Sequence, residues 1–384
     1  MSVKRVLQCN VDDANFGGVF SLVMNVFEQL HKTSDIRFDF CTTEAFKNES
    51  SIEKIKDLGG LAFCIGYSGN KILKQFINFK NYYSFFKNNK YAVVHINADL
   101  AFKLFVPALA AKLCKVKKII VHSHNSGVDG VNRRIKYLAH KVFKMFLPLL
   151  ADTFLSCSET ASKWMYTKSV RNIVLIKNGI DTEKFKFNDK TRKEYREKNC
   201  LENNFVIGHV GGFKYQKNHE FLIDIFEHVY KKDKTARLLL VGVSDPKENY
   251  LAKIREKVKK SGLNDAVIFW GGSYEIFNLY QMMDVFVFPS RFEGLGIVVI
   301  EAQSSGLYAV CSDKIPKEAK ITELFVNLEL KNADIWAEKI LEIKNKNSER
   351  KNMKGEIEAA GYDINNSAKV LEQIYRAAWK HSQS

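Results

Sequence analysis

Short apolar runs alternate with helix-length segments along the whole chain, and this alternation limits the folds that are open to it. Val93–Ile96, Phe205–Val210 and Val285–Phe288 are examples of such runs. Apolar runs bounded by turn residues are typical of buried parallel strands, whose connecting helices cover both faces of the sheet. Because the pattern occurs in both halves of the chain, we expect an α/β protein with two doubly wound parallel sheets.

At 384 residues the chain is long enough for two domains with full cores. We place the first domain at residues 1–180 and the second at residues 181–364. The charged segment 182–202 has weak periodicity, and we interpret it as an interdomain linker with an exposed helix. No apolar run approaches the 18 residues that a membrane crossing needs, and the N-terminus lacks the apolar core of a signal peptide. We therefore expect a cytoplasmic protein.

Two further patterns exclude other classes. Seven cysteines without CxxC spacing indicate free thiols and argue against a zinc site. The turn after the first strand contains Gly17-Gly18 but no G-x-G-x-x-G, which argues against a nicotinamide dehydrogenase. The two glycines can serve a tight turn or allow close approach of a donor phosphate, and the residues alone leave both interpretations open.

The basic charge is concentrated in the first half. Residues 1–180 contain 26 Lys and Arg against 13 Asp and Glu, so they carry +13 of the total of +16. Segments 70–90 and 131–149 are both basic helical patterns with apolar residues at helical spacing. Each can be an ordinary surface helix, but two of them in one half favour docking on an anionic membrane surface. No nucleic-acid-binding motif is visible, so we expect no nucleic-acid partner.

The most informative stretch runs from Val285 to Gly306. It reads as a buried strand, a turn containing Gly294, Leu295 and Gly296, and a helix. Glu293 stands before the turn and Glu301 lies on the helix. Eight residues of helix span about 12 Å, which is more than the separation of the paired carboxylates in glycoside hydrolases. Two acids that hold different parts of one long ligand fit this spacing better.

A pair of histidines lies at the end of another predicted strand. His122-Ser123-His124 follows Ile119–Val121, and ligand sites of open α/β sheets collect at the carboxyl ends of strands. No nearby carboxylate completes a metal site, so contact with sugar hydroxyls is the better interpretation. Of the two we favour His124.

The stretch from Glu293 to Glu301, in its strand–turn–helix context, resembles the E-x7-E motif of glycosyltransferase family 4. Three other motifs support this resemblance, which extends over nearly the whole chain: Gly17-Gly18 at the N-terminal turn, Asn178–Asp181 at the hinge, and Val210–His219 at the diphosphate loop. It implies the GT-B fold, in which two Rossmann-like domains bind acceptor and donor respectively. It also implies that the C-terminal helix, residues 365–384, packs back on the first domain.

The resemblance implies a retaining hexosyltransferase of capsule or exopolysaccharide assembly, peripheral on the inner face of the cell membrane. Its partners would be a nucleotide-sugar donor, with a UDP-sugar favoured, and a lipid-linked saccharide acceptor. In the family the first glutamate contacts donor sugar hydroxyls and the second contacts the ribose, which places these roles on Glu293 and Glu301. His124 matches a functional histidine of the family. The remaining expected donor-binding residues are Gly17, Gly18, Gly212, Lys214, Lys217, Gly294, Leu295 and Gly296.

The expected chemistry needs positive charge at the diphosphate leaving group, and Lys217 is placed to supply it. Where the family pattern has arginine this chain has Gly212, and Lys214 is the nearest basic residue that could replace it. No D-x-D triplet indicates a divalent cation at the donor site, so we expect metal-independent chemistry and no cofactor beyond the donor itself. Retention would follow the same-face mechanism of the family, in which the leaving phosphate helps to deprotonate the acceptor. Two alternatives remain: a sugar-nucleotide 2-epimerase of the same fold, and a non-catalytic protein that binds nucleotide sugars.

Overall fold

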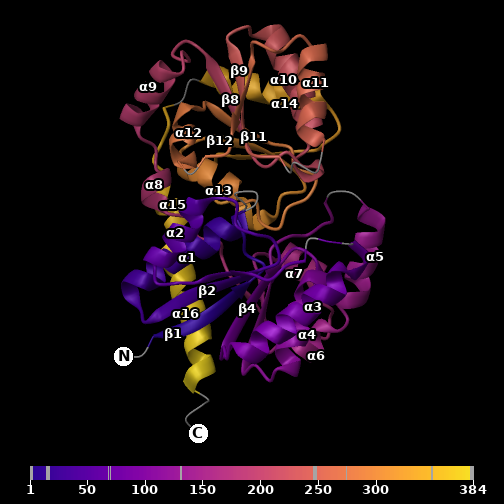
Figure 1. Cartoon of the computed structure of the whole chain (residues 1–384). Helices are drawn as coiled ribbons and strands as arrows, with labels where there is room; N and C mark the ends of the chain where they lie inside the picture. Colours follow the sequence, from indigo (N-terminus) through magenta and orange to yellow (C-terminus); the bar gives the residue numbers. More distant parts are fainter. Residues whose placement is uncertain are drawn as a thin grey trace. The chain divides into compact units, whose positions relative to one another are not determined.

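The computed structural model describes residues 3–13, 18–67, 69, 71–129, 132–244, 249–273, 275–346 and 349–380. The chain divides into two compact units. Unit 1 contains Met1–Gly179 and Ile364–Ser384, and unit 2 contains Ile180–Asp363. Each unit is built on one parallel sheet (Figure 1), which confirms the predicted α/β class with two doubly wound sheets.

Seven parallel strands form the sheet of unit 1, in the order β3-β2-β1-β4-β5-β6-β7. The order reverses between β1 and β4, which is the position where ligands bind in doubly wound folds. The strands are β1 (Lys4–Cys9), β2 (Ile36–Thr42), β3 (Ala62–Cys64), β4 (Val93–Ala98), β5 (Lys118–Ser123), β6 (Thr153–Ser156) and β7 (Ile173–Leu175).

Helices cover both faces of this sheet. One face packs against α1 (Gly18–Thr33) and α16 (Ile364–Lys380), whose residues Ile364, Ala368, Leu371 and Tyr375 recur at helical spacing and are buried. In Figure 1 the yellow α16 runs beside the indigo α1. The opposite core includes residues of α3 and α4. The other helices of unit 1 are α2 (Glu49–Asp57), α3 (Lys71–Asn88), α4 (Ala101–Leu113), α5 (Arg133–Phe143), α6 (Leu147–Leu150) and α7 (Glu159–Met165).

The predicted helical segment 131–149 is wrong as a single element. It is divided into α5, which ends at Phe143, and the short α6, which has Pro148 in its first turn. Proline lacks the N–H that a continuing helix needs but is tolerated in a first turn. Within α5 only His140 is buried, so most of its apolar side chains face solvent.

Six parallel strands form the sheet of unit 2, in the order β10-β9-β8-β11-β12-β13. The sequence did not lead us to expect the last two, because β13 is a four-residue edge strand with partly exposed side chains. The strands are β8 (Phe205–Val210), β9 (Ala236–Val241), β10 (Val267–Gly271), β11 (Val285–Phe288), β12 (Tyr308–Ser312) and β13 (Phe325–Leu328).

The helices of unit 2 include two in the segment that we had interpreted as a linker. The segment is not an exposed linker, because Arg192 and Arg196 form ion pairs with Asp284 and Arg196 is buried. The helices are α8 (Thr182–Phe185), α9 (Asp189–Lys198), α10 (His219–Lys232), α11 (Tyr250–Lys260), α12 (Ile276–Met282), α13 (Ile297–Ser304), α14 (Ala333–Lys346) and α15 (Lys354–Ala359), with one-turn 3-10 helices at Tyr215–Lys217 and Lys317–Ala319. Among the described residues, no helix combines the length and apolar character that a membrane crossing requires.

Candidate functional site

The turn between β11 and α13 has a geometry that requires glycine. Gly296 has a φ of +85° at the N-terminus of α13, a left-handed conformation that residues with a Cβ rarely adopt. Leu295 and Ser290 are buried, so the turn is packed into the unit. The predicted strand, turn and helix are therefore present, and the start of α13 lies at the carboxyl end of a parallel strand.

A second loop follows β8 and is joined to the first by several hydrogen bonds. The side-chain amide of Asn218 donates to the Pro289 carbonyl over 3.1 Å. The Gln216 amide donates to the Phe292 carbonyl over 2.9 Å, and the Arg291 N–H donates to the Gln216 carbonyl over 2.8 Å. The loops at the ends of β8 and β11 thus form one surface of unit 2, with the N-termini of α10 and α13 behind them.

Lys217 and Glu293 meet where these two loops join. Lys217 Nζ lies 2.7 Å from Glu293 Oε1, and the exposed fractions of the two side chains are 16% and 7%. The same ammonium lies 4.7 Å from the centroid of the Phe288 ring. A pair this well shielded is held in a fixed geometry, because separating it would leave a charge in a poorly hydrated site. Two residues predicted from different parts of the sequence are therefore in direct contact.

The two glycines after β8 differ in how much space they leave. A Cβ on Gly211 would lie 3.2 Å from Lys217 Cδ, Lys217 Cε and His209 Nε2. A Cβ on Gly212 would lie 3.3 Å from the Val243 carbonyl oxygen and 3.8 Å from Lys214 Cε. Neither glycine has a positive φ. A Cβ is therefore in tight contact at both positions: at Gly211 the Lys217 and His209 side chains would have to move, and at Gly212 a backbone carbonyl oxygen would.

Glu301 lies on α13 with a tyrosine as its partner. Tyr280 Oη lies 2.8 Å from Glu301 Oε2. Desolvation raises the pKa of Glu301 to about 7, and the hydrogen bond from Tyr280 opposes this shift only in part. Near neutral pH the carboxyl group is therefore about half protonated.

In unit 1 the two predicted histidines lie together at the end of β5. His122 is buried and His124 is half-buried, and their ring centroids are 3.9 Å apart. His124 Nε2 lies 2.9 Å from Asn97 Oδ1. Burial lowers the pKa of His124 to about 3, so the ring is neutral. Of the predicted glycine turn, Gly18 is the first residue of α1, and Gly17 lies outside the described residues.

Sequence reasoning missed several partners of these groups. Tyr280 on α12 and the set His95, Asn97 and Tyr375 in unit 1 were not singled out. A signal was present for His95 and Asn97, because both interrupt a buried strand that is otherwise apolar. Buried polar side chains need hydrogen-bond partners, so such interruptions indicate a network.

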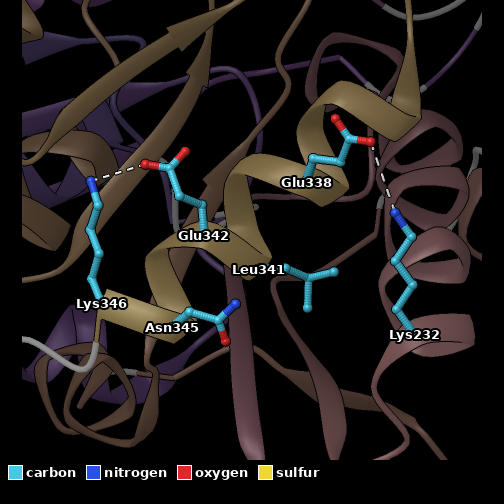
Figure 2. A pocket seen from close by; sticks show the side chains of 6 residues that line it. All are labelled: Lys232, Glu338, Leu341, Glu342, Asn345 and Lys346. Carbon is cyan, nitrogen blue, oxygen red and sulfur yellow. Dashed lines mark ion pairs between the residues drawn. The ribbon is translucent and has the colours of Figure 1, made fainter.

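Two other features do not add to the site. Among the residues that the structure describes, no group of three or more His, Cys, Asp or Glu side chains is placed to hold a metal ion. Figure 2 shows a surface hollow with an exposed ion pair between Glu342 and Lys346. This hollow lies at the C-terminal end of α10, a helix about 21 Å long whose other end follows Lys217. It is lined by Lys232, Glu338, Leu341, Glu342, Asn345 and Lys346. We assign no function to it.

Two family models match the chain. The model described as Glycosyltransferase Family 4 matches residues 16–184. The model described as Glycosyl transferases group 1 matches residues 191–359. Together they cover both units.

Several curated proteins and solved structures are similar to the chain. EpsF of Bacillus subtilis (strain 168), which is named as a glycosyltransferase, is 31% identical over 97% of each protein. The Escherichia coli UDP-Gal:alpha-D-GlcNAc-diphosphoundecaprenol alpha-1,3-galactosyltransferase is 25% identical over 74% of this chain and 76% of its own length. Other relatives are named as capsular polysaccharide biosynthesis glycosyltransferases of Staphylococcus aureus. The crystal structure of Anabaena Alr3699/HepE in complex with UDP-glucose has a TM-score of 0.78 at 14% identity and covers 97% of this chain and 99% of its own, which shows the shared fold.

Proposed function

The chain belongs to glycosyltransferase family 4, and from this premise we propose that it transfers a sugar from a UDP-sugar to a lipid-linked saccharide with retention at the anomeric carbon. That it is a glycosyltransferase of the capsule and exopolysaccharide type follows from its relatives. The finer proposal rests on one observation above all, the shielded contact between Lys217 and Glu293 beside two helix N-termini.

The donor would bind to unit 2 at this contact. The N-termini of α10 and α13 offer unpaired N–H groups and the positive ends of helix dipoles, which suit a diphosphate. Lys217 would supply charge to the leaving diphosphate, and Glu293 would accept hydrogen bonds from the sugar hydroxyls while it stays paired with Lys217. Glu301 would accept hydrogen bonds from the ribose. A UDP-sugar is favoured because a relative's name states UDP-Gal and a structural neighbour was solved with UDP-glucose.

The reaction needs no metal ion in this proposal. Lys217 and the two helix termini would stabilise the charge that develops on the diphosphate. The leaving phosphate would then accept the proton of the attacking hydroxyl on the same face of the sugar, and this gives retention. The family implies this path, and the absence of a D-x-D triplet in the sequence is compatible with it.

A panel of UDP- and GDP-sugars tests the proposal. The wild-type protein should bind at least one UDP-sugar and hydrolyse it slowly when no acceptor is present, with release of the sugar in its original anomeric form. Release of the 2-epimer would instead identify the epimerase alternative. Tight binding without any turnover would identify a non-catalytic binding protein, and binding of GDP-sugars alone would contradict the UDP assignment.

Donor affinity is expected to rise with pH through the ionisation of Glu301. A hydroxyl donates more strongly to a carboxylate than to a protonated carboxyl group, and the pKa of Glu301 is about 7. If only the ionised form binds, affinity for UDP-glucose should increase about 10-fold between about pH 6 and about pH 8. Burial lowers the pKa of the neighbouring histidines, His209 to about 4 and His219 well below its usual range, so neither titrates in this window. Calorimetric titration across the pH range measures the effect.

Two variants serve as controls for this pH dependence. Glu301→Gln should make the profile flat, and Tyr280→Phe should move its midpoint to higher pH because it removes a bond that favours the ionised form. Protein stability gives a second readout. The folded pKa of about 7 lies above the ordinary value of 4.5, so the folded state keeps the proton longer, and the free energy of unfolding should fall between these pH values by at most about 3 kcal/mol. An unchanged profile in Glu301→Gln would remove this residue from the donor site.

The acceptor proposal places unit 1 on an anionic membrane surface. Ile135, Leu138 and Leu149 are 70%, 64% and 71% exposed, and a cluster of exposed apolar side chains marks a contact surface. The basic residues of the same segment are Arg133, Arg134, Lys136, Lys141 and Lys144. A basic helix with an outward apolar side is suited to the membrane interface. A relative's name states a diphosphoundecaprenol acceptor, which would lie in such a membrane.

Vesicle co-sedimentation should show that binding needs both anionic lipid and the apolar side chains. Replacing Ile135, Leu138 and Leu149 with Ser should abolish most binding, because each buried aliphatic side chain contributes about 1.5–3 kcal/mol. Replacing Arg133, Arg134 and Lys141 with Ser should weaken binding to anionic vesicles by about 1 kcal/mol per residue and reduce its salt dependence.

The matched control for these variants is Ile335→Ser, an equivalent change at an exposed apolar residue of unit 2. It should leave binding unchanged. Equal binding of the wild-type protein to neutral vesicles would contradict the electrostatic contribution. No binding to either kind of vesicle would remove the membrane from the proposal.

A further inference from the structure

A group of buried polar side chains lies on the face of the unit 1 sheet that α1 and α16 cover. Gln8 on β1, Asn97 on β4 and His122 on β5 come from the carboxyl-terminal parts of their strands. His95 comes from the middle of β4, and Tyr375 comes from α16. Each of the five is at most 2% exposed. Burying so many polar groups is costly unless all of them are hydrogen-bonded. Each of these side chains is therefore expected to have hydrogen-bond partners.

The hydroxyl of Tyr375 is the origin of two branches of hydrogen bonds. In the first branch, Tyr375 Oη lies 2.7 Å from His95 Nδ1, and His95 Nε2 lies 3.2 Å from His122 Nδ1. In the second branch, Gln8 Nε2 lies 3.2 Å from Tyr375 Oη, and Asn97 Nδ2 lies 3.1 Å from Gln8 Oε1. That branch continues from Asn97 Oδ1 to His124 Nε2 over 2.9 Å. Each branch therefore ends on a histidine.

The Tyr375 hydroxyl makes the hydrogen bonds of the two branches run in opposite directions, from donor to acceptor along one and from acceptor to donor along the other. It has one proton and serves two partners, so it donates to one and accepts from the other. With the Gln8 amide donating to it, the hydroxyl donates to His95 Nδ1, and His95 Nε2–H then donates to His122 Nδ1. His122 consequently carries its own proton on Nε2. Along the other branch His124 Nε2–H donates to Asn97, which leaves a lone pair on His124 Nδ1.

This opposition does not depend on how the two amides are assigned. If both amides were turned over, every bond would reverse, and His122 Nε2 would carry the lone pair while His124 Nδ1 carried the proton. In both cases one nitrogen is a donor and the other an acceptor. The 3.5 Å approach of Asn97 Nδ2 to the His95 carbonyl oxygen favours the first arrangement, because an amide N–H can donate to that oxygen.

The two terminal nitrogens, His122 Nε2 and His124 Nδ1, have no hydrogen-bond partner among the residues that the structure describes, although the centroids of their rings are only 3.9 Å apart. Every other donor or acceptor atom named in the two branches has a hydrogen-bond partner. A hydroxyl group is the ligand that matches one donor and one acceptor on two adjacent rings, because it accepts through oxygen and donates its proton. A carboxylate or an ammonium group would satisfy only one of the two nitrogens.

We propose that Tyr375 is a positioning residue which holds His122 and His124 with opposite proton patterns, so that together they bind one sugar hydroxyl. This inference rests on the proposed function for the identity of the ligand, and it adds His122 and the last helix to the part of unit 1 that recognises it. The hydroxyl can belong to the donor sugar or to the acceptor saccharide. The hydrogen-bond pattern of the network identifies the ligand group as a hydroxyl. Binding and kinetic measurements identify the molecule that carries it.

Ligand-free protein tests the network itself. With nitrogen-15 in the histidine rings, NMR should show a single tautomer for His95, His122 and His124, with the protons of His122 and His124 both on Nε2. Tyr375→Phe keeps the ring that packs on Phe38 and His95 and removes the origin of both branches, so His95 and His122 should then show mixed tautomers. Tyr166→Phe is the control, since it removes another buried hydroxyl, which bonds to the Val121 and Leu155 carbonyls. It should leave the tautomers unchanged.

Binding and kinetics identify the source of the hydroxyl. If it belongs to the donor sugar, Tyr375→Phe and His122→Phe should weaken UDP-glucose or UDP-galactose about 10-fold, the factor of one neutral hydrogen bond, and leave UDP unchanged. If it belongs to the acceptor, donor affinity should stay constant and the KM for the acceptor should rise by a similar factor.

Three results would overturn the inference: identical tautomers in Tyr375→Phe and the wild type, equal losses in Tyr375→Phe and Tyr166→Phe, or no change in either affinity or KM. Failure of the proposed function would look different. In that case the wild-type protein would bind no nucleotide sugar at all, while the tautomers of the ligand-free protein would still report whether Tyr375 sets the proton pattern.

Discussion

Lys217→Met is expected to lower kcat by about 100- to 1000-fold, the usual effect of removing one group that stabilises developing negative charge. Methionine keeps most of the side-chain volume beside Phe288 and removes the ammonium group. The substitution also removes the ammonium group that pairs with Glu293, whose side chain is 7% exposed. Breaking a buried pair in this way costs about 3–5 kcal/mol, so turnover must be measured together with thermal unfolding.

The double variant Lys217→Met with Glu293→Gln separates catalysis from stability. Neutralising both members of the pair also removes the buried negative charge of Glu293, so much of the lost stability should return while turnover stays low. Lys344→Met is the matched control, because Lys344 pairs with the mostly buried Asp233 over 2.6 Å elsewhere in unit 2. It should lower stability and leave turnover per folded molecule unchanged. If the double variant recovered turnover with its stability, neither Lys217 nor Glu293 would be needed for turnover, and both would be structural residues only.

Most of the fold could be predicted because strand and helix periods are local. Phe205–Val210, Val285–Phe288 and Ile297–Ser304 have the bounds expected from their apolar runs and their flanking glycine and proline. The errors have local causes too. Pro148 divides a basic segment that looks periodic from end to end, and the charged segment 182–202 is held in place by ion pairs to Asp284, which lies about a hundred residues away in sequence.

The site is less predictable because its properties depend on contacts between distant residues. Spacing alone suggested Glu293 and Lys217 as candidates, but it could not show that the two are paired. Likewise, the raised pKa of Glu301 results from burial and from Tyr280 on another helix, and neither can be read from the sequence around α13. The link from Tyr375 to His122 joins residues 253 positions apart in the sequence (375 − 122), which no local pattern could reveal.

Gly212→Arg is expected to increase donor affinity by about 1.5–3 kcal/mol, the contribution of one charge-assisted hydrogen bond. Arginine offers a planar fork of donors that suits phosphate oxygens, and the family pattern has arginine at this place. The backbone is no obstacle, since Gly212 has no positive φ. A Cβ there needs the Val243 carbonyl oxygen, 3.3 Å away, to move by a few tenths of an ångström, while Lys214 Cε at 3.8 Å is in ordinary contact.

Alanine substitutions at Gly212 and at the neighbouring Gly211 are the controls for Gly212→Arg. Gly212→Ala adds only the Cβ, so it measures the cost of moving the Val243 carbonyl oxygen and should bring no gain in donor affinity. Gly211→Ala should lower turnover, because its Cβ would press on Lys217 Cδ and Cε at 3.2 Å and displace the ammonium group from Glu293. A stable Gly212→Arg protein without any gain would mean that the diphosphate does not lie beside this loop. Lys217 would then act on another part of the donor, and the loss in Gly211→Ala would report its pairing with Glu293 alone.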